Sequence, residues 1–276
     1  MIQGTKQWLE ARKSFVTATD SSVIMGINPW KTPYKLWRQK MDLDPPEEEN
    51  QRMREGTMME PHAREWFIKE TGIHCEPKVL IKDFMMASLD GLSSDQKCIV
   101  EIKCGSKSFA QAEELKIPNY YLCQMQHQMY VANVTLAYYI AFNGEEGIIM
   151  PVIRNDEFIE NMIQKEKDFY QCLISFTPPT MTTRDYQTKS DPEWKALAEN
   201  YRIAYQALKN AEQLEQNLKQ QLIASSGGLS SMGEGIKLSK VLRKGQIEYS
   251  KIPELTGLDL EPYRKNNTEY WKVSLD

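Results

Sequence analysis

The spacing of apolar residues predicts a chain that mixes helices and strands. Apolar positions three and four residues apart are typical of helices, and alternation of apolar with polar positions is typical of strands. The helices expected on this basis cover residues 4–13, 34–41, 51–70, 105–116, a stretch from Pro118 to about 131, and 156–175. The expected strands form an antiparallel set over 74–81, 84–92 and 99–103, followed by a hairpin over 136–142 and 148–153.

The last third of the chain has a different pattern. From residue 193 to 224 apolar residues recur at steps of three and four, which predicts one helix about 50 Å long. A helix of this length needs a partner helix, the core domain or a neighbouring subunit to cover its apolar face. The predicted organisation is a core domain over 1–177, a linker over 178–190, and an extension over 191–276 with short strands over 236–242, 246–249 and 269–274.

The expected fold class is α+β, with a central mixed sheet flanked by helices, plus the long helix and a small β-containing tail. The tail interleaves basic with aromatic residues, which is compatible with DNA contact. Acidic residues in the same region make a simple folded tail an equal alternative.

The hairpin over residues 88–104 carries the clearest candidate chemistry. Asp90 ends one strand, and Glu101 lies on the next strand on the same face as Lys103, because side chains alternate along a strand. Two carboxylates beside an ammonium group suit a hard cation such as Mg²⁺ and a lysine that orients or activates water. The alternative is a solvated ion pair between Glu101 and Lys103.

Two helices could add side chains to this hairpin. Gly56 weakens a helix unless something approaches it closely, which favours packing of helix 51–70 on the hairpin with Glu60 directed at the carboxylates. Gln124, on a later helix, could contact a phosphate or the attacking water. In both cases the alternative is an exposed polar side chain.

A phosphate site is a further candidate near the start of the chain. Thr19 or Asp20 can cap a short helix that ends at Gly26, and Arg12 lies shortly before it. A helix start with hydroxyl groups and an arginine is suited to a phosphate. The alternative is a plain capped helix with a surface arginine.

Composition limits the class of protein. The 276 residues carry a formal net charge of −4, which argues against a protein that simply coats DNA but is compatible with a nuclease whose groove is locally basic. The five cysteines form no Cys-x-x-Cys pair, as expected for reduced thiols in the cytoplasm. No apolar run approaches 18 residues and no leader is evident, so we expect no membrane span.

Taken together, the motifs resemble those of the YqaJ-type viral recombinases, the group that includes lambda exonuclease within the PD-(D/E)xK nuclease superfamily. The resemblance covers about residues 5–175, and its pieces come in the order and at the spacing of the family. The matching residues are Trp8-Leu9-Glu10-Ala11-Arg12, Val16-Thr17-Ala18-Thr19-Asp20, Gly56 to Glu60 with Ala63-Arg64, Ser88-Leu89-Asp90-Gly91-Leu92, Glu101-Ile102-Lys103-Cys104 and Gln124-Met125-Gln126.

This resemblance implies a restriction-endonuclease-like core and a Mg²⁺-dependent exonuclease that degrades one strand of linear, 5′-phosphorylated duplex DNA from its 5′ end. Two Mg²⁺ ions are implied, with Mn²⁺ able to substitute. The implied roles are as follows: Asp90, Glu101, Glu60 and the Ile102 carbonyl as metal ligands, Lys103 and Gln124 beside the nucleophilic water, and Arg12, Thr19 and Ser88 at the 5′-phosphate. By analogy we expect a ring-shaped homotrimer, a single-strand annealing protein as partner, and a phage or prophage protein in the cytoplasm of a bacterial host.

Two departures and two alternatives accompany the resemblance. Leu89 stands where the superfamily name places proline, and the last 90 or so residues lack a counterpart in lambda exonuclease, which leaves the oligomer geometry open. An endonuclease of the same superfamily is one alternative; its iron–sulfur branch is disfavoured because only Cys172 lies beyond Cys123. A non-catalytic module that binds DNA ends or acts as a recombination scaffold is the other.

Overall fold

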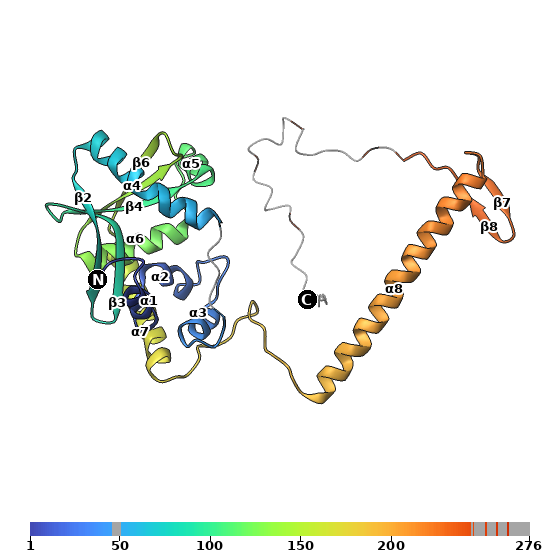
Figure 1. Cartoon of the computed structure of the whole chain (residues 1–276), viewed down its shortest axis with the longest axis horizontal. Helices are drawn as coiled ribbons and strands as arrows, with labels where there is room; N and C mark the ends of the chain where they lie inside the picture. The colour runs from blue at the N-terminus through green and yellow to red at the C-terminus, as the bar shows by residue number, and fades with distance from the viewer. Residues whose placement is uncertain (46–50, 244, 246–251, 253–257, 259–263, 265–276) are drawn as a thin grey trace. The chain divides into compact units, whose positions relative to one another are not determined.

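The computed structural model describes residues 1–45, 51–243, 245, 252, 258 and 264. The chain forms two compact units, Met1–Gln187 and Thr188–Asp276 (Figure 1). The strands expected over 246–249 and 269–274, and with them most of the basic and aromatic tail, lie outside the described residues.

The first unit is built on a six-stranded mixed sheet. Its strands are β1 (Val16–Thr17), β2 (Cys75–Lys82), β3 (Met85–Ser93), β4 (Cys98–Cys104), β5 (Leu136–Phe142) and β6 (Gly147–Ile153). The order is β1-β3-β4-β5-β6, with β2 paired to β3. Pairs β2–β3, β3–β4 and β5–β6 are antiparallel, while β1–β3 and β4–β5 are parallel. The mixed sheet and both antiparallel sets agree with the sequence prediction, but the two-residue β1 was not predicted.

Helices cover both faces of this sheet (Figure 1). They are α1 (Lys6–Ser14), α2 (Ala18–Ile24), α3 (Pro33–Lys40), α4 (Gln51–Thr71), α5 (Ser106–Glu113), α6 (Asn119–Ala132) and α7 (Asp156–Ile174). Alternation along β4 sends Val100 and Ile102 into a cluster with Ala63 and Phe67 of α4. Ile99, on the opposite face, packs in a cluster with methionines of α6. Glu101 and Lys103 therefore share the α6 face, as the alternation predicted.

The start of α2 differs from the sequence prediction. Its N-cap is Thr17, not Thr19 or Asp20. Asp20, at the third helical position, accepts hydrogen bonds from the Thr17 backbone N–H and hydroxyl at 2.8 and 2.7 Å. This is the carboxylate half of a capping box, in which a side chain three residues into the helix satisfies the backbone before it.

The first unit continues past the expected end of the core at residue 177. Asp185 accepts a hydrogen bond from Thr32, the N-cap of α3. Arg184 donates to the carbonyls of Asn28 and Pro29 at 3.1 and 2.7 Å. Part of the segment expected as a linker is therefore bonded to the first unit.

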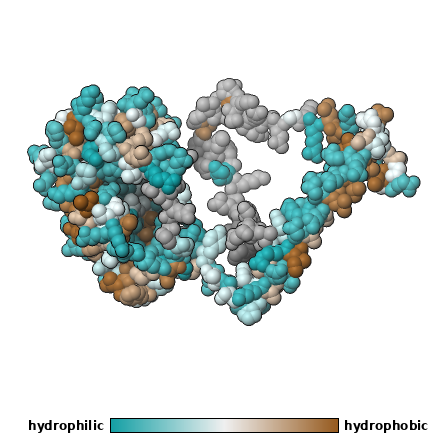
Figure 2. All heavy atoms as spheres, viewed as in Figure 1, coloured by the Kyte–Doolittle hydropathy of each residue, from teal (hydrophilic) through white to brown (hydrophobic). Residues whose placement is uncertain are grey.

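The second unit contains α8 (Pro192–Ser225) and a small hairpin of β7 (Ser231–Gly233) and β8 (Ile236–Leu238). Asp191 caps α8 by accepting a hydrogen bond from Trp194 N–H at 2.9 Å, and Pro192 occupies the first helical position. No residue of α8 is buried, and its apolar side chains are visible along the helix in Figure 2. The strand expected over 236–242 ends at Leu238.

Two properties of the whole described chain bear on its chemistry. Within the described part, no helix is both long and apolar enough to cross a membrane. The five cysteines are free thiols, and Cys75, Cys98 and Cys123 are buried.

Candidate active site

The candidate site forms where one edge of β3 lacks a strand partner. On this edge β1 pairs with Met85 and Met86, whereas β4 pairs only with Gly91 and Leu92. The other edge is taken by β2. Residues 87–90 therefore have no ladder partner on the β4 side, and both Ser88 and Asp90 lie in this gap. Backbone groups in such a gap need side chains to satisfy them.

Asp90 fills one part of the gap. Its Oδ2 accepts a hydrogen bond from the Ile102 N–H at 2.8 Å, and the residue is buried. Burial raises the pKa of Asp90 well above its usual value, and the nearby carboxylates of Glu101 and Glu60 raise it further, while Lys103 opposes the shift. The three carboxylates therefore interact electrostatically, as the sequence predicted for Asp90 and Glu101.

Glu101 is held by amide and ammonium groups. Its Oε1 accepts a hydrogen bond from Gln124 Nε2 at 2.6 Å and lies 2.5 Å from Lys103 Nζ. Its Oε2 accepts a hydrogen bond from Gln128 Nε2 at 2.6 Å. Because Glu101 is only 1% exposed, these donors replace water around a buried charge. Gln124 is therefore a buried partner of the carboxylate and not the exposed amide that was its alternative.

Lys103 remains a cation in this arrangement. Its Nζ lies beside Glu101 and 4.8 Å from the centre of the Tyr121 ring. Burial alone would lower the pKa of Lys103, but the charges of Glu101 and Asp90 outweigh it and raise the pKa above its usual value. An ammonium group can donate hydrogen bonds to a water or a phosphate but cannot accept a proton.

Glu60 reaches the site from α4 with the help of Arg64. Arg64 Nη1 lies 3.4 Å from Glu60 Oε1 and donates to the Asp90 carbonyl at 2.7 Å. Burial is the main cause that raises the pKa of Glu60; Arg64 opposes the rise and Glu101 adds to it. Glu60 is thus partly buried near the other carboxylates, as predicted. The close approach expected at Gly56 is absent: no described atom lies within 4 Å of where a Cβ would stand.

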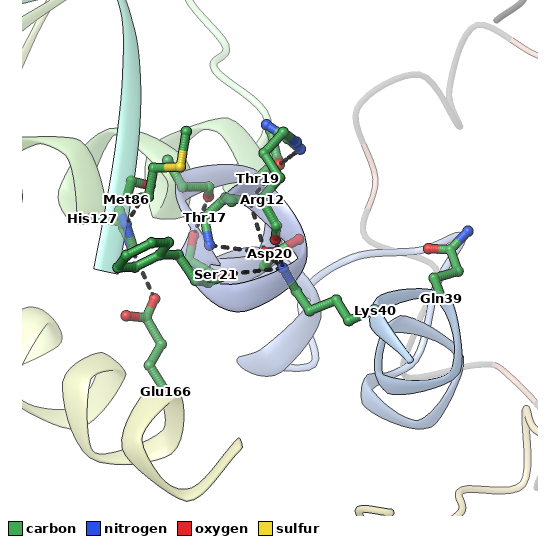
Figure 3. A network of polar contacts seen from close by, with 12 residues as sticks. Arg12, Thr17, Thr19, Asp20, Ser21, Gln39, Lys40, Met86, His127 and Glu166 are labelled. Atoms are coloured by element: carbon green, nitrogen blue, oxygen red, sulfur yellow. Dashed lines mark hydrogen bonds and ion pairs between the residues drawn. The ribbon is translucent and has the colours of Figure 1, made fainter. Parts of the chain in front are cut away.

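The three predicted phosphate-binding residues come together around Trp8. Trp8 Nε1 donates to Ser88 Oγ at 2.8 Å, and the Arg12 guanidinium lies 4.7 Å from the centre of the Trp8 ring. Arg12 Nη2 donates to Thr19 Oγ1 at 3.1 Å (Figure 3). A guanidinium and two hydroxyl groups are suitable donors for a phosphate.

A buried ion pair supports this group of residues. Lys40 of α3 contacts Asp20 of α2 at 2.7 Å (Figure 3). The Lys40 Nζ also donates to the carbonyls of Arg12 and Phe15 at 2.6 and 2.8 Å. One ammonium group therefore joins α2 and α3 to the end of α1, where Arg12 lies. This contact therefore ties the backbone of Arg12 to α2 and α3.

Side chains of α6 that do not contact Glu101 also anchor the helix. His127 Nδ1 lies 2.9 Å from Glu166 of α7, and its Nε2 lies 3.3 Å from the Met86 carbonyl (Figure 3). Gln126 donates to the Ile153 carbonyl at 2.9 Å and accepts from the Asn155 N–H at 2.8 Å. These bonds hold the helix that carries Gln124 and Gln128.

The donor set suits a hard cation, although the carboxylates do not converge on one point. Among the residues that the structure describes, no three His, Cys, Asp or Glu side chains are grouped closely enough to hold a metal ion. Mg²⁺ does not need such a cage, because it commonly binds through one or two carboxylates together with water and substrate phosphate. Burial is the main cause of the raised pKa values of Asp90 and Glu60, and neighbouring carboxylates add to it; a bound dication would favour the charged form of both groups.

Sequence reasoning did not assign Trp8, Arg64 or Gln128 to the site. Each lies four residues from a residue that was assigned, namely Arg12, Glu60 and Gln124. Residues four apart on a helix share a face, so this spacing is the signal that could have identified them.

Comparison with known proteins gives relatives for the first unit. An uncharacterized protein YqaJ of Bacillus subtilis (strain 168) is 28% identical over 178 residues, which cover 61% of this chain and 56% of the relative. The match thus spans little more than half of that relative's length. A crystal structure of LHK-Exo in complex with dAMP is 26% identical with a TM-score of 0.56, over 63% of this chain and 94% of that chain. A second structure, of the alkaline exonuclease LHK-Exo from Laribacter hongkongensis, is 25% identical with a TM-score of 0.55 over the same shares.

The fold therefore belongs to the class of mixed α/β domains seen in exonuclease structures, with a central sheet flanked by helices. Residues 7–135, which include every predicted site residue, match the YqaJ-like viral recombinase domain. The family whose model matches this segment is the one that the motifs in the sequence resemble, and the Bacillus subtilis relative points the same way.

Proposed function

We propose that this protein is a Mg²⁺-dependent exonuclease that digests one strand of linear duplex DNA from a 5′-phosphorylated end. The observation that carries the proposal is the unpaired stretch of β3, which holds Asp90 of the carboxylate group and Ser88 of the phosphate group two residues apart on one strand face. A terminal phosphate and a scissile phosphate could thus be held side by side. The exonuclease relatives and the YqaJ-like domain support the same activity.

The site residues would have separate roles in binding the metal, orienting the water and binding the terminal phosphate. Bound Mg²⁺, or Mn²⁺ in its place, would supply positive charge beside the scissile phosphate. Asp90, Glu101, Glu60 and the Ile102 carbonyl would hold two such ions. Lys103, as an ammonium group, would donate hydrogen bonds that orient the attacking water and stabilise developing negative charge, and Gln124 would fix the Glu101 carboxylate beside it. Arg12, Thr19 and Ser88 would bind the terminal 5′-phosphate.

Linear and closed circular DNA, each incubated with Mg²⁺ or with EDTA, test the activity. We expect Mg²⁺-dependent release of nucleotides from 5′-phosphorylated linear duplex only, and loss of an end label from the 5′ strand first. Lys103→Ala should lower the rate about 10²–10³-fold, the range for loss of one hydrogen-bond donor to developing negative charge. Cutting of the circle would instead favour an endonuclease of the same superfamily. Intact DNA in every reaction would favour a non-catalytic scaffold that binds DNA ends.

The assembly and partners of the proposed enzyme rest on the resemblance alone. We propose a homo-oligomer, with a trimeric ring as the expected form, and a single-strand annealing protein that receives the exposed strand in the cytoplasm of a bacterial host. Light scattering of the full chain measures the mass of the assembly. A monomer at micromolar concentration would contradict the ring.

A further inference from the structure

Gln128 bridges the two strands at the point where their ladder stops. Its Nε2 donates to Glu101 Oε2 on β4 at 2.6 Å and to the Ser88 carbonyl on β3 at 3.2 Å. The last ladder partners are Gly91 and Val100, so neither Ser88 nor Glu101 has a backbone partner on the other strand. One amide group therefore replaces a missing connection between these strands.

The orientation of this amide follows from its surroundings. Both neighbours of Nε2 are acceptors, so a flipped amide would place Oε1 against two oxygen atoms. Oε1 has no hydrogen-bond partner among the described residues, although Gln128 is fully buried. A buried amide with an unpaired oxygen is costly, and an apolar side chain of similar size would avoid that cost beside Met125 and Met129. Packing alone therefore does not account for a glutamine here.

We propose that Gln128 is a positioning residue that sets the distance between the metal-binding carboxylate and the phosphate-binding strand. This inference rests on the proposed function, because Glu101 is the proposed metal ligand and Ser88 belongs to the proposed 5′-phosphate site. Gln128 touches neither the metal nor the DNA in this role. It acts through Glu101 and through the backbone of Ser88, whose hydroxyl accepts from Trp8.

Two effects follow from removing the amide. Without Gln128, Oε2 of Glu101 loses its donor, and residues that orient a metal ligand typically change metal affinity or activity by about 10–100-fold when they are mutated. The Ser88 carbonyl also loses its donor, which leaves the bond from the Ile102 N–H to Asp90 as the remaining link across the gap. The separation between the terminal phosphate and the scissile phosphate is then held less firmly. The enzyme should then discriminate less well between 5′-phosphorylated and 5′-hydroxyl ends.

The test compares Gln128→Met with Gln126→Met in the full chain. Methionine has nearly the shape of glutamine but donates no hydrogen bond. Gln126 is a matched control, because it is a buried glutamine on the same helix whose bonds go to Ile153 and Asn155 and not to the site. Mn²⁺ affinity is measured without DNA, from the electron paramagnetic resonance signal of free Mn²⁺. The rate ratio between 5′-phosphorylated and 5′-hydroxyl duplex is measured separately.

We expect Gln128→Met to weaken Mn²⁺ binding about tenfold and to reduce the rate ratio, while Gln126→Met, which removes bonds that anchor α6 but do not reach Glu101 or Ser88, changes both much less. The inference would be overturned if Gln128→Met kept the Mn²⁺ affinity and the rate ratio of the wild type. Equal losses in both variants would also overturn it, because they would indicate a general loosening of α6. Should Gln128→Met not fold, Gln128→Asn, whose amide is too short to reach both acceptors, must show the same two losses. Wild-type protein that binds Mn²⁺ but degrades no DNA would contradict the proposed function. The Mn²⁺ affinities of Gln128→Met, Gln126→Met and wild type would still test whether Gln128 positions Glu101.

Discussion

At the scale of single residues, the Asp20–Lys40 contact offers a test of how the phosphate group is supported. Burial alone would raise the pKa of Asp20, but the charges of Lys40 and Arg12, with hydrogen bonds from Lys40 and Thr17, outweigh it and lower the pKa below its usual value. A carboxyl with a lowered pKa in the folded state stabilises the fold above its unfolded pKa of about 3.9, and that stabilisation is lost as pH falls through the folded pKa.

Asp20→Asn should therefore lower the free energy of unfolding by about 3 kcal/mol at pH 7, because it leaves the Lys40 ammonium buried beside a neutral side chain. The difference from wild type should shrink as pH falls below about 4, through the lowered pKa of Asp20. Denaturant unfolding at several pH values measures this difference. Asp42→Asn is the control: Asp42 pairs with Lys13 at the surface, where such pairs contribute about 1 kcal/mol or less. Equal effects of the two variants would contradict a special role for Asp20.

The residues that carry the proposed chemistry were predictable, but their supports were not. Asp90, Glu101 and Lys103 follow from alternation along two adjacent strands, which is a local property of the sequence. Gln128 and Arg64 act on backbone carbonyls of β3, at Ser88 and Asp90. Their spacing of four residues from Glu60 and Gln124 indicates a shared helix face, but any carbonyl in the chain is a possible acceptor, so the sequence does not specify which carbonyls they contact.

At the scale of elements, two glycines near α4 have opposite environments. Gly56, inside α4, has no atom of the described residues within 4 Å of where a Cβ would stand. Gly56→Ala should therefore raise the free energy of unfolding by about 0.5–1 kcal/mol, since alanine favours the helix and restricts the unfolded chain. Thermal unfolding measures this change. If the variant is stabilised but hydrolyses DNA more slowly, the space at Gly56 is needed by the substrate.

Gly147, at the start of β6, has no such space. A Cβ there would stand 2.5 Å from the Trp66 ring of α4. Gly147→Ala should lower the free energy of unfolding by about 1–3 kcal/mol, because the ring must move out of its packed position. The same unfolding experiment serves for both variants. A stability equal to wild type would show that Trp66 moves without cost.

The elements themselves were largely predicted, except where pairing is non-local. Capping residues such as Thr32 and Asn155 and the break before Pro118 mark helix ends in the sequence. By contrast, β1 has only two residues and is a strand solely because it lies along β3. The same pairing creates the gap at 87–90, so the feature that places the site could not be derived from local pattern.

At the scale of the whole molecule, the first unit should fold without the second. The boundary between the two units lies between Gln187 and Thr188, and the hydrogen bonds of Arg184 and Asp185 are made within the first unit. A chain that stops after Gln187 should keep the unfolding midpoint of the first unit. A chain that stops after Thr177 should lose about 1–3 kcal/mol, since Thr32 and two carbonyls lose their partners.

Full-length Asp185→Ala provides the control for this truncation. It removes the bond to Thr32 without shortening the chain, so it should be destabilised in the same direction as the shorter fragment. Equal stability of the chains ending at residues 177 and 187 would show that residues 178–187 act only as a connection.

The buried free thiols can report local unfolding of the folded chain, because they react only when they become exposed. Burial raises the pKa of Cys75 to about 11 and that of Cys123 to about 12, so hardly any reactive thiolate exists at neutral pH. Alkylating reagents can then react only in molecules whose β2 edge or α6 layer has transiently detached. Because the two thiols lie in different layers, comparing their labelling rates under native conditions would rank the layers by the free energy needed to expose each one.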